Sequence, residues 1–444
     1  MSHARKILFF FAASIAVGGA ILSMPFVRHV PCQPAVGGSS AWLTGFFTAA
    51  SAICVTGLSV VNINEYFNLG GQLVILVLIQ IGALGYVTFA TASGMILGKI
   101  QIRERLAIKE VVDPYSFEGL LALLKRIIKM AIVIELAGAV VLSSLFLRYF
   151  PPLKAVYYGV FHAVSAFANA GFSLFPSSFE FFSRDYGIMA VLCALILSGG
   201  IGFLVLAELL DFRRIKGLTL HAKMALIVSG VLLVAGTAAV LIFESSNPDT
   251  FGGRGIIEKI GNAVFLSVTA RTAGFNTIKT AMLSPSTLFF LMMLMFVGAS
   301  PGGTGGGIKT TTFGSAILWA FAFIRGKEDV NVFGRKIPHE QVRKSGAYVM
   351  MGLATLLVSY LVFSFVEPAL EPLEPLEGMF EVVSAFGTVG LSTGITPYLG
   401  GGAKIILIFT MITGRIGPLT LAMSAITRRE KDLIQYPEER IVIG

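Results

Sequence analysis

The chain has 444 residues, of which 55% are hydrophobic and only 13% are charged. Because soluble domains carry about 25% charged residues, this composition excludes an ordinary water-soluble protein and predicts a chain embedded in lipid. Three scattered cysteines and five histidines without ligand spacing predict no disulfide framework, no metal-ligand cluster and no covalently bound cofactor.

Eight apolar stretches follow one another along the chain, and each is long enough to cross a hydrocarbon core of about 30 Å. The first follows Arg5 and Lys6, as a signal peptide would, but it lacks a small-residue cleavage site and further spans follow. We therefore expect an all-α membrane protein with spans near 7–27, 70–98, 127–147, 187–210, 224–243, 285–324, 346–366 and 403–426.

The basic residues gather on one side of this arrangement. Most of the 34 Lys and Arg residues lie at the N-terminus or in the segments after the second, fourth, sixth and eighth spans. Since basic residues are retained in the cytoplasm, both termini are expected there, with the chain in the plasma (inner) membrane. This distribution explains the net charge of +9 without nucleic acid as a partner.

A shorter apolar segment, too short to cross a membrane, lies between the spans of each pair and ends in a glycine. Aligned on that glycine, the segments read Ser51-Ala-Ile-Cys-Val-Thr-Gly57, Ser165-Ala-Phe-Ala-Asn-Ala-Gly171, Val268-Thr-Ala-Arg-Thr-Ala-Gly274 and Ser384-Ala-Phe-Gly-Thr-Val-Gly390. A phenylalanine precedes the glycine by ten residues in three copies and by nine in the third. The recurrence predicts four repeats, at 1–98, 99–215, 216–330 and 331–444, the last with a cytoplasmic C-terminal tail.

Irregular backbone at membrane depth is tolerated only where it lines a water-filled path or is buried in protein. Four helix–pore-loop–helix units are therefore predicted around a pseudo-fourfold pore, with short helices whose C-terminal ends favour a cation. Glycine accepts positive φ there, and backbone carbonyls can replace the hydration shell of an ion. The alternative is that the glycines only allow close helix packing. The predicted selectivity filter comprises Cys54, Val55, Thr56, Gly57, Ala168, Asn169, Ala170, Gly171, Arg271, Thr272, Ala273, Gly274, Gly387, Thr388, Val389 and Gly390.

The stretch 285–324 is longer than one span requires, because 40 residues of helix extend about 60 Å. Six glycines and a proline interrupt it between Gly298 and Lys309, and they cannot sustain a helix. A phosphate-binding loop is the alternative, but Ile308 separates the last glycine from Lys309, where that motif needs them adjacent. We expect an irregular loop within the membrane.

These features resemble the Ktr/Trk/HKT superfamily of potassium transporters, in particular its KtrB-type membrane subunits. The resemblance rests on the four glycine segments, on Gln80-Ile-Gly-Ala-Leu-Gly85, on Arg271-Thr-Ala-Gly-Phe-Asn276 and on Gly414-Arg-Ile-Gly-Pro-Leu-Thr420. It implies potassium uptake, with the ion bound by filter carbonyls, and leaves open whether sodium supports transport. It also implies a homodimer, surrounding membrane lipid and a cytoplasmic ring of nucleotide-binding RCK domains from a separate subunit.

In the resembled family, the loop inside the sixth span is a gate that an arginine matching Arg415 contacts. The predicted gate comprises Gly298, Ser300, Gly302, Gly303, Thr304, Gly305, Gly306, Gly307, Lys309 and Arg415. A charge inside a span normally faces a cavity or a partner, although Lys309 could also reach the cytoplasmic interface.

Three further charged features are predicted. Arg271 is expected to point behind the filter, since a guanidinium in the pore would repel a cation. Glu135 is expected to have a partner within the helix bundle. The cluster Glu367, Glu371, Glu374, Glu377 and Glu381 is either a solvated loop or an anionic mouth that concentrates cations.

Two functions from other classes remain as alternatives. A secondary transporter with discontinuous helices would also show glycine-broken spans, although usually in two repeats. A membrane-embedded enzyme lacks support, because no catalytic constellation is evident and enzymatic activity is not expected. A Trk-type subunit is the alternative within the resembled family, because the gate stretch is rich in glycine.

Overall fold

The computed structural model describes residues 3–29, 40–96, 117–211, 217–367 and 375–425. The expected repeat boundaries near 98 and 215, much of the basic segments that predicted the orientation, and the expected tail lie outside these residues. So do Glu371 and Glu374 of the acidic cluster.

Within the described residues, the helices pack in four groups along the chain. Each group has a long first helix, a short buried helix and an apolar second segment that packs against one or both of them. The groups are α1 (His3–Ser23), α2 (Ala41–Ile53) and α4 (Leu69–Ile96); α6 (Phe117–Phe146), α7 (Pro152–Phe167), α8 (Tyr186–Gly200) and α9 (Phe203–Leu210); α10 (Leu220–Glu244), α11 (Ile256–Thr269), α12 (Pro285–Phe296) and α13 (Thr310–Ile324); α14 (His339–Val366), α15 (Pro375–Gly387), α16 (Gly401–Ile416) and α17 (Pro418–Ala425).

The second segment is interrupted in the last three groups. The axes of α8 and α9 differ by 108° at Gly202, whose φ is 100°. Residues 297–309 separate α12 from α13, and Gly417, with φ 92°, separates α16 from α17. The continuous spans expected over 187–210 and 403–426 are thus broken, because a left-handed glycine redirects the chain in each. Only the break inside 285–324 was expected.

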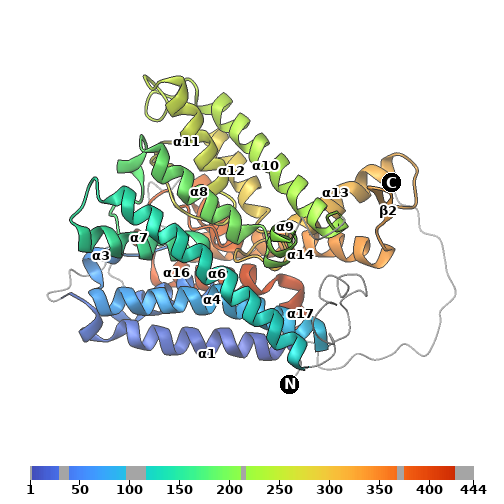
Figure 1. The fold of residues 1–444 in the computed structure, drawn as a ribbon, viewed down its shortest axis with the longest axis horizontal. Helices are drawn as coiled ribbons and strands as arrows, with labels where there is room; N and C mark the ends of the chain where they lie inside the picture. Colours follow the sequence, from blue (N-terminus) through green and yellow to red (C-terminus); the bar gives the residue numbers. More distant parts are fainter. Residues whose placement is uncertain (1–2, 30–39, 97–116, 212–216, 368–374, 426–444) are drawn as a thin grey trace.

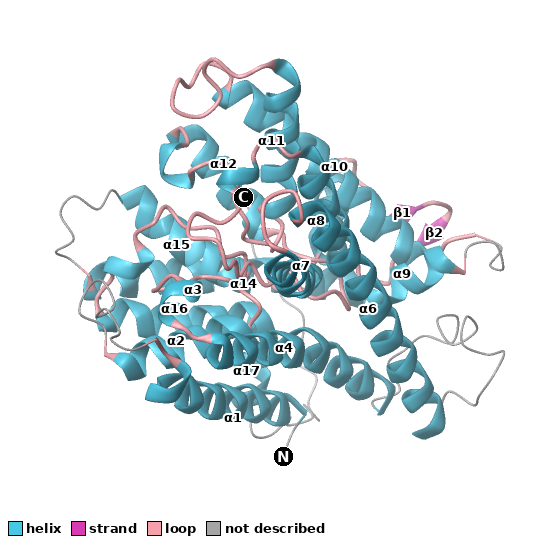
Figure 2. Cartoon of the chain, turned by 60° about the vertical axis from the view of Figure 1, so that its left-hand side comes forward, coloured by secondary structure: helices cyan, strands magenta, loops and turns pink. Residues whose placement is uncertain are grey.

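The four groups close into a ring. The second segment of each group contacts the short helix of the next: α4 meets α7, α8 meets α11, α12 meets α15, and α16 meets α2. Figure 2 shows the consequence, with loop segments gathered in the middle of the molecule among the surrounding helices.

Four described helices are long and apolar enough to cross a membrane, or five if the bent pair α8–α9 is taken as one span. The four lie in α1, α6, α10 and α14, the first helices of the groups. Pro285–Phe296 and Thr310–Ile324, the two helices of one interrupted second segment, are apolar but shorter. The breaks and bends divide the second segments of the last three groups, so each helix in them is shorter than a membrane-spanning helix.

Small elements connect the helices. They are η1 (Pro25–Val27), α3 (Ile63–Tyr66), η2 (Glu180–Phe182), η3 (Thr280–Met282), η4 (Thr396–Tyr398), and the antiparallel pair β1 (Asn331–Val332) and β2 (Arg335–Lys336). The β1–β2 hairpin and the adjoining ends of α13 and α14 project at one end of the molecule (Figure 1).

Candidate functional site

The loops that follow the four short helices meet around one axis. A Cβ atom added to the glycine of one loop would clash with the carbonyl oxygen of the residue before the glycine in the next loop, and the fourth loop meets the first in the same way. The glycines are Gly57, Gly171, Gly274 and Gly390, and the carbonyl groups belong to Ala170, Ala273, Val389 and Thr56, respectively. The structure therefore brings together all four glycines of the sequence pattern.

The backbone of the four loops alternates in handedness. The glycines have φ of 93°, 70°, 78° and 91°, and the residue two positions earlier is also left-handed in each loop. Those earlier residues are Val55 (57°), Asn169 (59°), Thr272 (76°) and Thr388 (49°). Left-handed valine and threonine are outliers that persist only where the surroundings hold them, and such residues cluster at functional sites.

Buried hydroxyl groups anchor the loops to their short helices. Ser51 and Ser384 accept hydrogen bonds from the glycine nitrogens of their own loops, at 3.0 and 3.1 Å. Ser165 and Thr269 instead donate to the carbonyl oxygen after the glycine, at 2.8 and 2.6 Å. Thr269, rather than Val268, is thus the counterpart of the serines, which means that the third loop is one residue shorter than the others.

Glycines in the second segments let the helices approach the loops. A Cβ at Gly82, Gly199 or Gly414 would collide with the last carbonyl groups of the short helix in its own group. Gly82 and Gly414 belong to the motifs that carried the family resemblance. In these positions the glycines do serve close packing, which was the alternative for the loop glycines.

The four loop glycines face a polar cavity of about 550 Å³ on the side where the chain leaves the loops. The charged residues in its lining are Glu180 and Lys279. Asn276 also lines the cavity and donates a hydrogen bond to Glu180 at 3.0 Å. Partial burial raises the pKa of Glu180. The sequence did not single out Glu180 and Lys279, because they lie in connecting segments that carry no repeat, whereas Asn276 ends the motif that begins at Arg271.

Arg271 lies behind the third loop. Its side chain is 7% exposed, and its guanidinium donates to the carbonyl oxygen of Ser229 at 3.1 Å and to the Ser229 hydroxyl at 2.9 Å. Ser229 belongs to α10, so the guanidinium joins the loop to the first helix of its own group. The side chain of Arg271 was expected to point behind the predicted filter, and its contact with α10 agrees with that expectation.

The glycine-rich segment 297–309 lies directly against the four loops. Thr304 donates to the carbonyl oxygen of Phe167 at 3.2 Å, and the nitrogen of Gly306 donates to the Thr388 hydroxyl at 2.9 Å. The nitrogens of Ser300 and Thr304 donate to Gly200 and Gly199 at the α8–α9 bend. Ser300 and Thr304 are fully buried, so residues 297–309 form an internal segment that packs against the loops, and we name this segment the plug.

Two basic side chains hold this segment from within. Arg415 is 1% exposed and donates from Nη1 to the Thr304 carbonyl oxygen and from Nη2 to the Gly82 carbonyl oxygen at 2.7 Å. Lys309 donates from Nζ to the Gly305 carbonyl oxygen at 2.7 Å. Both residues therefore bind backbone oxygens of or beside the plug, and Lys309 does not extend to the surface as its alternative required.

Two of the three described members of the acidic cluster, Glu381 and Glu367, accept hydrogen bonds within the protein. Glu381 is fully buried and accepts hydrogen bonds from the Ser392 and Thr396 hydroxyl groups at 2.5 and 2.7 Å. Glu367 accepts one from the nitrogen of Gly400 at 3.0 Å. Neither lines the polar cavity, whose carboxylate is instead Glu180.

Glu135 lies in the bundle interior, 6% exposed, and accepts a hydrogen bond from Gln80 Nε2 at 2.6 Å. Gln80 begins the motif that ends at Gly85, so the expected partner lies on α4. Among the described residues, no group of three or more His, Cys, Asp or Glu side chains could hold a metal ion.

Known proteins are similar to this chain in sequence and in fold. Residues 26–435 match the TrkH family, described as a cation transport protein. The chain is 37% identical to the potassium/sodium uptake protein NtpJ of Enterococcus hirae, covering 97% of this chain and 94% of that protein. It is also 37% identical to the Ktr system potassium uptake protein B of Bacillus subtilis, covering 98% and 95%. The fold matches the potassium transporter TrkH from Vibrio parahaemolyticus with a TM-score of 0.72 at 19% identity, over 96% of this chain and 86% of that one.

Proposed function

The chain belongs to the TrkH family of cation transport proteins, and from this premise we propose that it carries potassium into the cell across the plasma membrane. Two relatives at 37% identity over nearly their full length are named for potassium uptake, one of them for sodium as well. The relatives are transporters, so no enzymatic activity is assigned.

The ring formed by Gly57, Gly171, Gly274 and Gly390 is the observation that carries this proposal. The carbonyl groups next to these glycines form a selectivity filter that replaces the hydration shell of potassium. The positive φ values and close approaches support this role, because close packing alone does not require four loops to meet in chain order. The filter also includes the three residues before each glycine.

The four groups of helices represent four repeats of helix, pore loop and helix, with eight spans around a pseudo-fourfold axis. The cyclic contacts between each second segment and the next short helix support this architecture. The bent and interrupted segments are counted as single spans that change direction below the filter. Both termini then lie in the cytoplasm, in agreement with the distribution of basic residues.

The segment 297–309 acts as the gate. Its hydrogen bonds to Phe167 and Thr388, in two of the four loop regions, support a role in blocking the ion path next to the filter. Arg415 and Lys309 hold its carbonyl groups, so opening requires that these contacts break or move together. Glycine provides the mobility that such a movement needs.

The protein is the membrane subunit of a Ktr-type system. The Bacillus subtilis relative is named as protein B of a Ktr system, which supports a system of several components. The homodimer and the separate cytoplasmic ring of nucleotide-binding RCK subunits are what the family resemblance implies for this chain. The Enterococcus hirae relative supports a test of sodium dependence. A Trk-type subunit is the second candidate, favoured by the fold match.

Growth of a bacterium that lacks its own potassium uptake systems tests the proposal. Expression of this chain, with and without a candidate RCK subunit, is expected to restore growth at micromolar potassium, and added sodium reveals any dependence. The variant Gly274→Ser, expressed to the same level, is the control. Growth that is equal in the variant, or absent under every condition, contradicts the proposal.

A further inference from the structure

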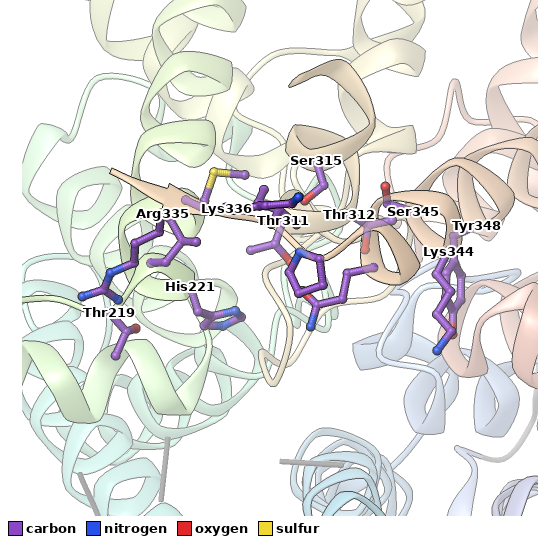
Figure 3. A pocket seen from close by; sticks show the side chains of 15 residues that line it. Thr219, His221, Thr311, Thr312, Ser315, Arg335, Lys336, Lys344, Ser345 and Tyr348 are labelled. Atoms are coloured by element: carbon purple, nitrogen blue, oxygen red, sulfur yellow. The ribbon is translucent and has the colours of Figure 1, made fainter. Parts of the chain in front are cut away.

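A second cavity, of about 680 Å³, lies where the first turns of α10, α13 and α14 meet the β1–β2 hairpin, and none of its lining residues belongs to the four glycine loops. Figure 3 shows its lining side chains, with Arg335 and Lys336 from the hairpin, Lys344 from α14, and Thr311, Thr312 and Ser315 from α13 around the hollow. Its lining also includes His221 and contains no aspartate or glutamate. The cavity is therefore suited to an anion.

Acidic groups do occur at its rim. Lys336 pairs with Asp329 at 2.5 Å, and Lys344 pairs with Glu340 on its own helix. Both pairs are solvent-exposed, and such pairs contribute little and exchange readily for a better ligand. The hydroxyl groups of the three α13 residues are half-buried and supply neutral donors on the inner side of the same hollow.

An apolar surface begins at the cavity and runs along α10. Met224 lines the cavity but is itself buried, and the exposed Ile227, Val231 and Val234 follow it at helical spacing. Their side chains are 48%, 61% and 66% exposed. A basic hollow that continues into an exposed apolar stripe matches a molecule with an anionic head and a hydrocarbon tail.

We propose that this cavity binds the phosphate of an anionic phospholipid from the cytoplasmic leaflet, with an acyl chain along the exposed face of α10. Basic pockets between membrane helices on the cytoplasmic side recognise anionic headgroups in this way. The leaflet follows from the proposed topology, whereas the match in charge and shape follows from the cavity itself. A soluble phosphate would satisfy the basic groups but would leave the apolar stripe uncovered.

The cavity adjoins the plug. Thr311 and Thr312 belong to the first turn of α13, and Thr310 at the start of that turn hydrogen-bonds to Ser300 of the plug at 2.8 Å. A headgroup bound to this turn restrains the helix end to which the plug is attached. Lipid occupancy therefore stabilises one position of the segment 297–309.

The test measures thermal unfolding of the purified full chain in detergent with added dioleoyl phosphatidylglycerol, with dioleoyl phosphatidylcholine as the matched neutral lipid. The double variant Arg335→Gln/Lys344→Gln removes charge from the cavity. The double variant Arg325→Gln/Lys327→Gln removes the same charge just beyond the C-terminal end of α13, outside the cavity lining. Flux is not measured, so failure here is distinguishable from failure of the proposed function.

Phosphatidylglycerol is expected to raise the unfolding temperature of the wild type and of the end-of-helix variant, and phosphatidylcholine is not. In the cavity variant, the lipid concentration required for half of this rise increases about 25-fold, because each of the two lost basic contacts contributes about fivefold. Equal responses in both double variants, or to both lipids, overturn the proposal. Full stabilisation by glycerol phosphate also overturns the proposal, because it indicates that the cavity binds a soluble anion. A change from dimer to monomer in the cavity variant alone overturns it as well, because it indicates that a second copy of the chain occupies the cavity.

Discussion

Replacing Gly57 by serine is expected to reduce the preference for potassium over sodium at least about tenfold. An added Cβ would lie 2.5 Å from the Ala170 carbonyl oxygen and 2.8 Å from the Gly171 Cα. The neighbouring loop must then retreat by about 0.9 Å to reach ordinary contact at 3.4 Å. In addition, a side chain at φ 93° costs about 1–2 kcal/mol, so the variant loop relaxes away from its position. A tenfold change corresponds to about 1.4 kcal/mol, which is within this range.

The assay is rubidium flux into proteoliposomes in competition with sodium, with folding checked by size-exclusion chromatography. Gly253→Ser is the matched control, because Gly253 has φ 71° but nothing within 4 Å of an added Cβ. It shares the backbone strain and lacks the close approach. An unchanged ion preference in folded Gly57→Ser, or an equal loss in Gly253→Ser, would refute the link between the glycine ring and selectivity.

Three further predictions concern single side chains. Arg415→Ala is expected to raise rubidium flux by at least about tenfold without changing ion preference, because it removes two hydrogen bonds from a charged donor, each of which contributes about 1.5–3 kcal/mol. Arg415→Lys keeps the charge but cannot make both contacts, so it should also raise flux if these contacts hold the gate. Wild-type flux in Arg415→Ala contradicts the gate. Glu135→Gln is expected to unfold within a few degrees of the wild type, whereas Glu135→Ala loses about 1–3 kcal/mol in free energy of unfolding because Gln80 is left without its partner. Equal losses for both variants in calorimetry would show that the hydrogen bond between Gln80 and Glu135 does not stabilise the fold. Burial raises the pKa of Glu180, so its carboxylate is protonated at milder acidity than an exposed one. Acidification outside should therefore lower uptake about twofold in the wild type and not in Glu180→Gln. Parallel pH profiles of the two proteins argue against a role for Glu180.

The repeated elements could be predicted from the sequence because the same local constraint recurs four times. A glycine that accepts positive φ, a preceding short apolar segment and a preceding phenylalanine are visible in the printed chain. The exception is the third loop, where alignment on the glycine hid the equivalence of Thr269 with the serines. Alignment on Phe265 and the hydroxyl residue four positions later would have revealed the shorter loop.

The direction of the chain after each break, and the hydrogen-bond partners of residues far apart in sequence, could not be predicted in the same way. Hydropathy counts residues but not the direction of the chain, so the bend at Gly202 and the helix break at Gly417 lay hidden within apolar stretches. Gly417-Pro418 was a local signal for one of them. The contact between Arg415 and the Gly82 carbonyl joins residues 333 positions apart, which no local pattern encodes.

The acidic cluster shows a second limit. Glu381 lies within α15, and composition alone could not distinguish a cation-attracting carboxylate from one that accepts hydrogen bonds from its own outer loop. Its burial and its partners Ser392 and Thr396 favour the second role. Glu180, which faces the cavity, occurs in a segment without any repeat.

Anomalous diffraction from crystals grown in rubidium tests the glycine ring most directly. Rubidium density is expected on the axis, within coordinating distance of the carbonyl oxygens of Thr56, Ala170, Ala273 and Val389, and it should fade when sodium replaces rubidium. Rubidium bound elsewhere in the membrane region with none on this axis, or equal density in sodium, would contradict a potassium filter built from these four loops.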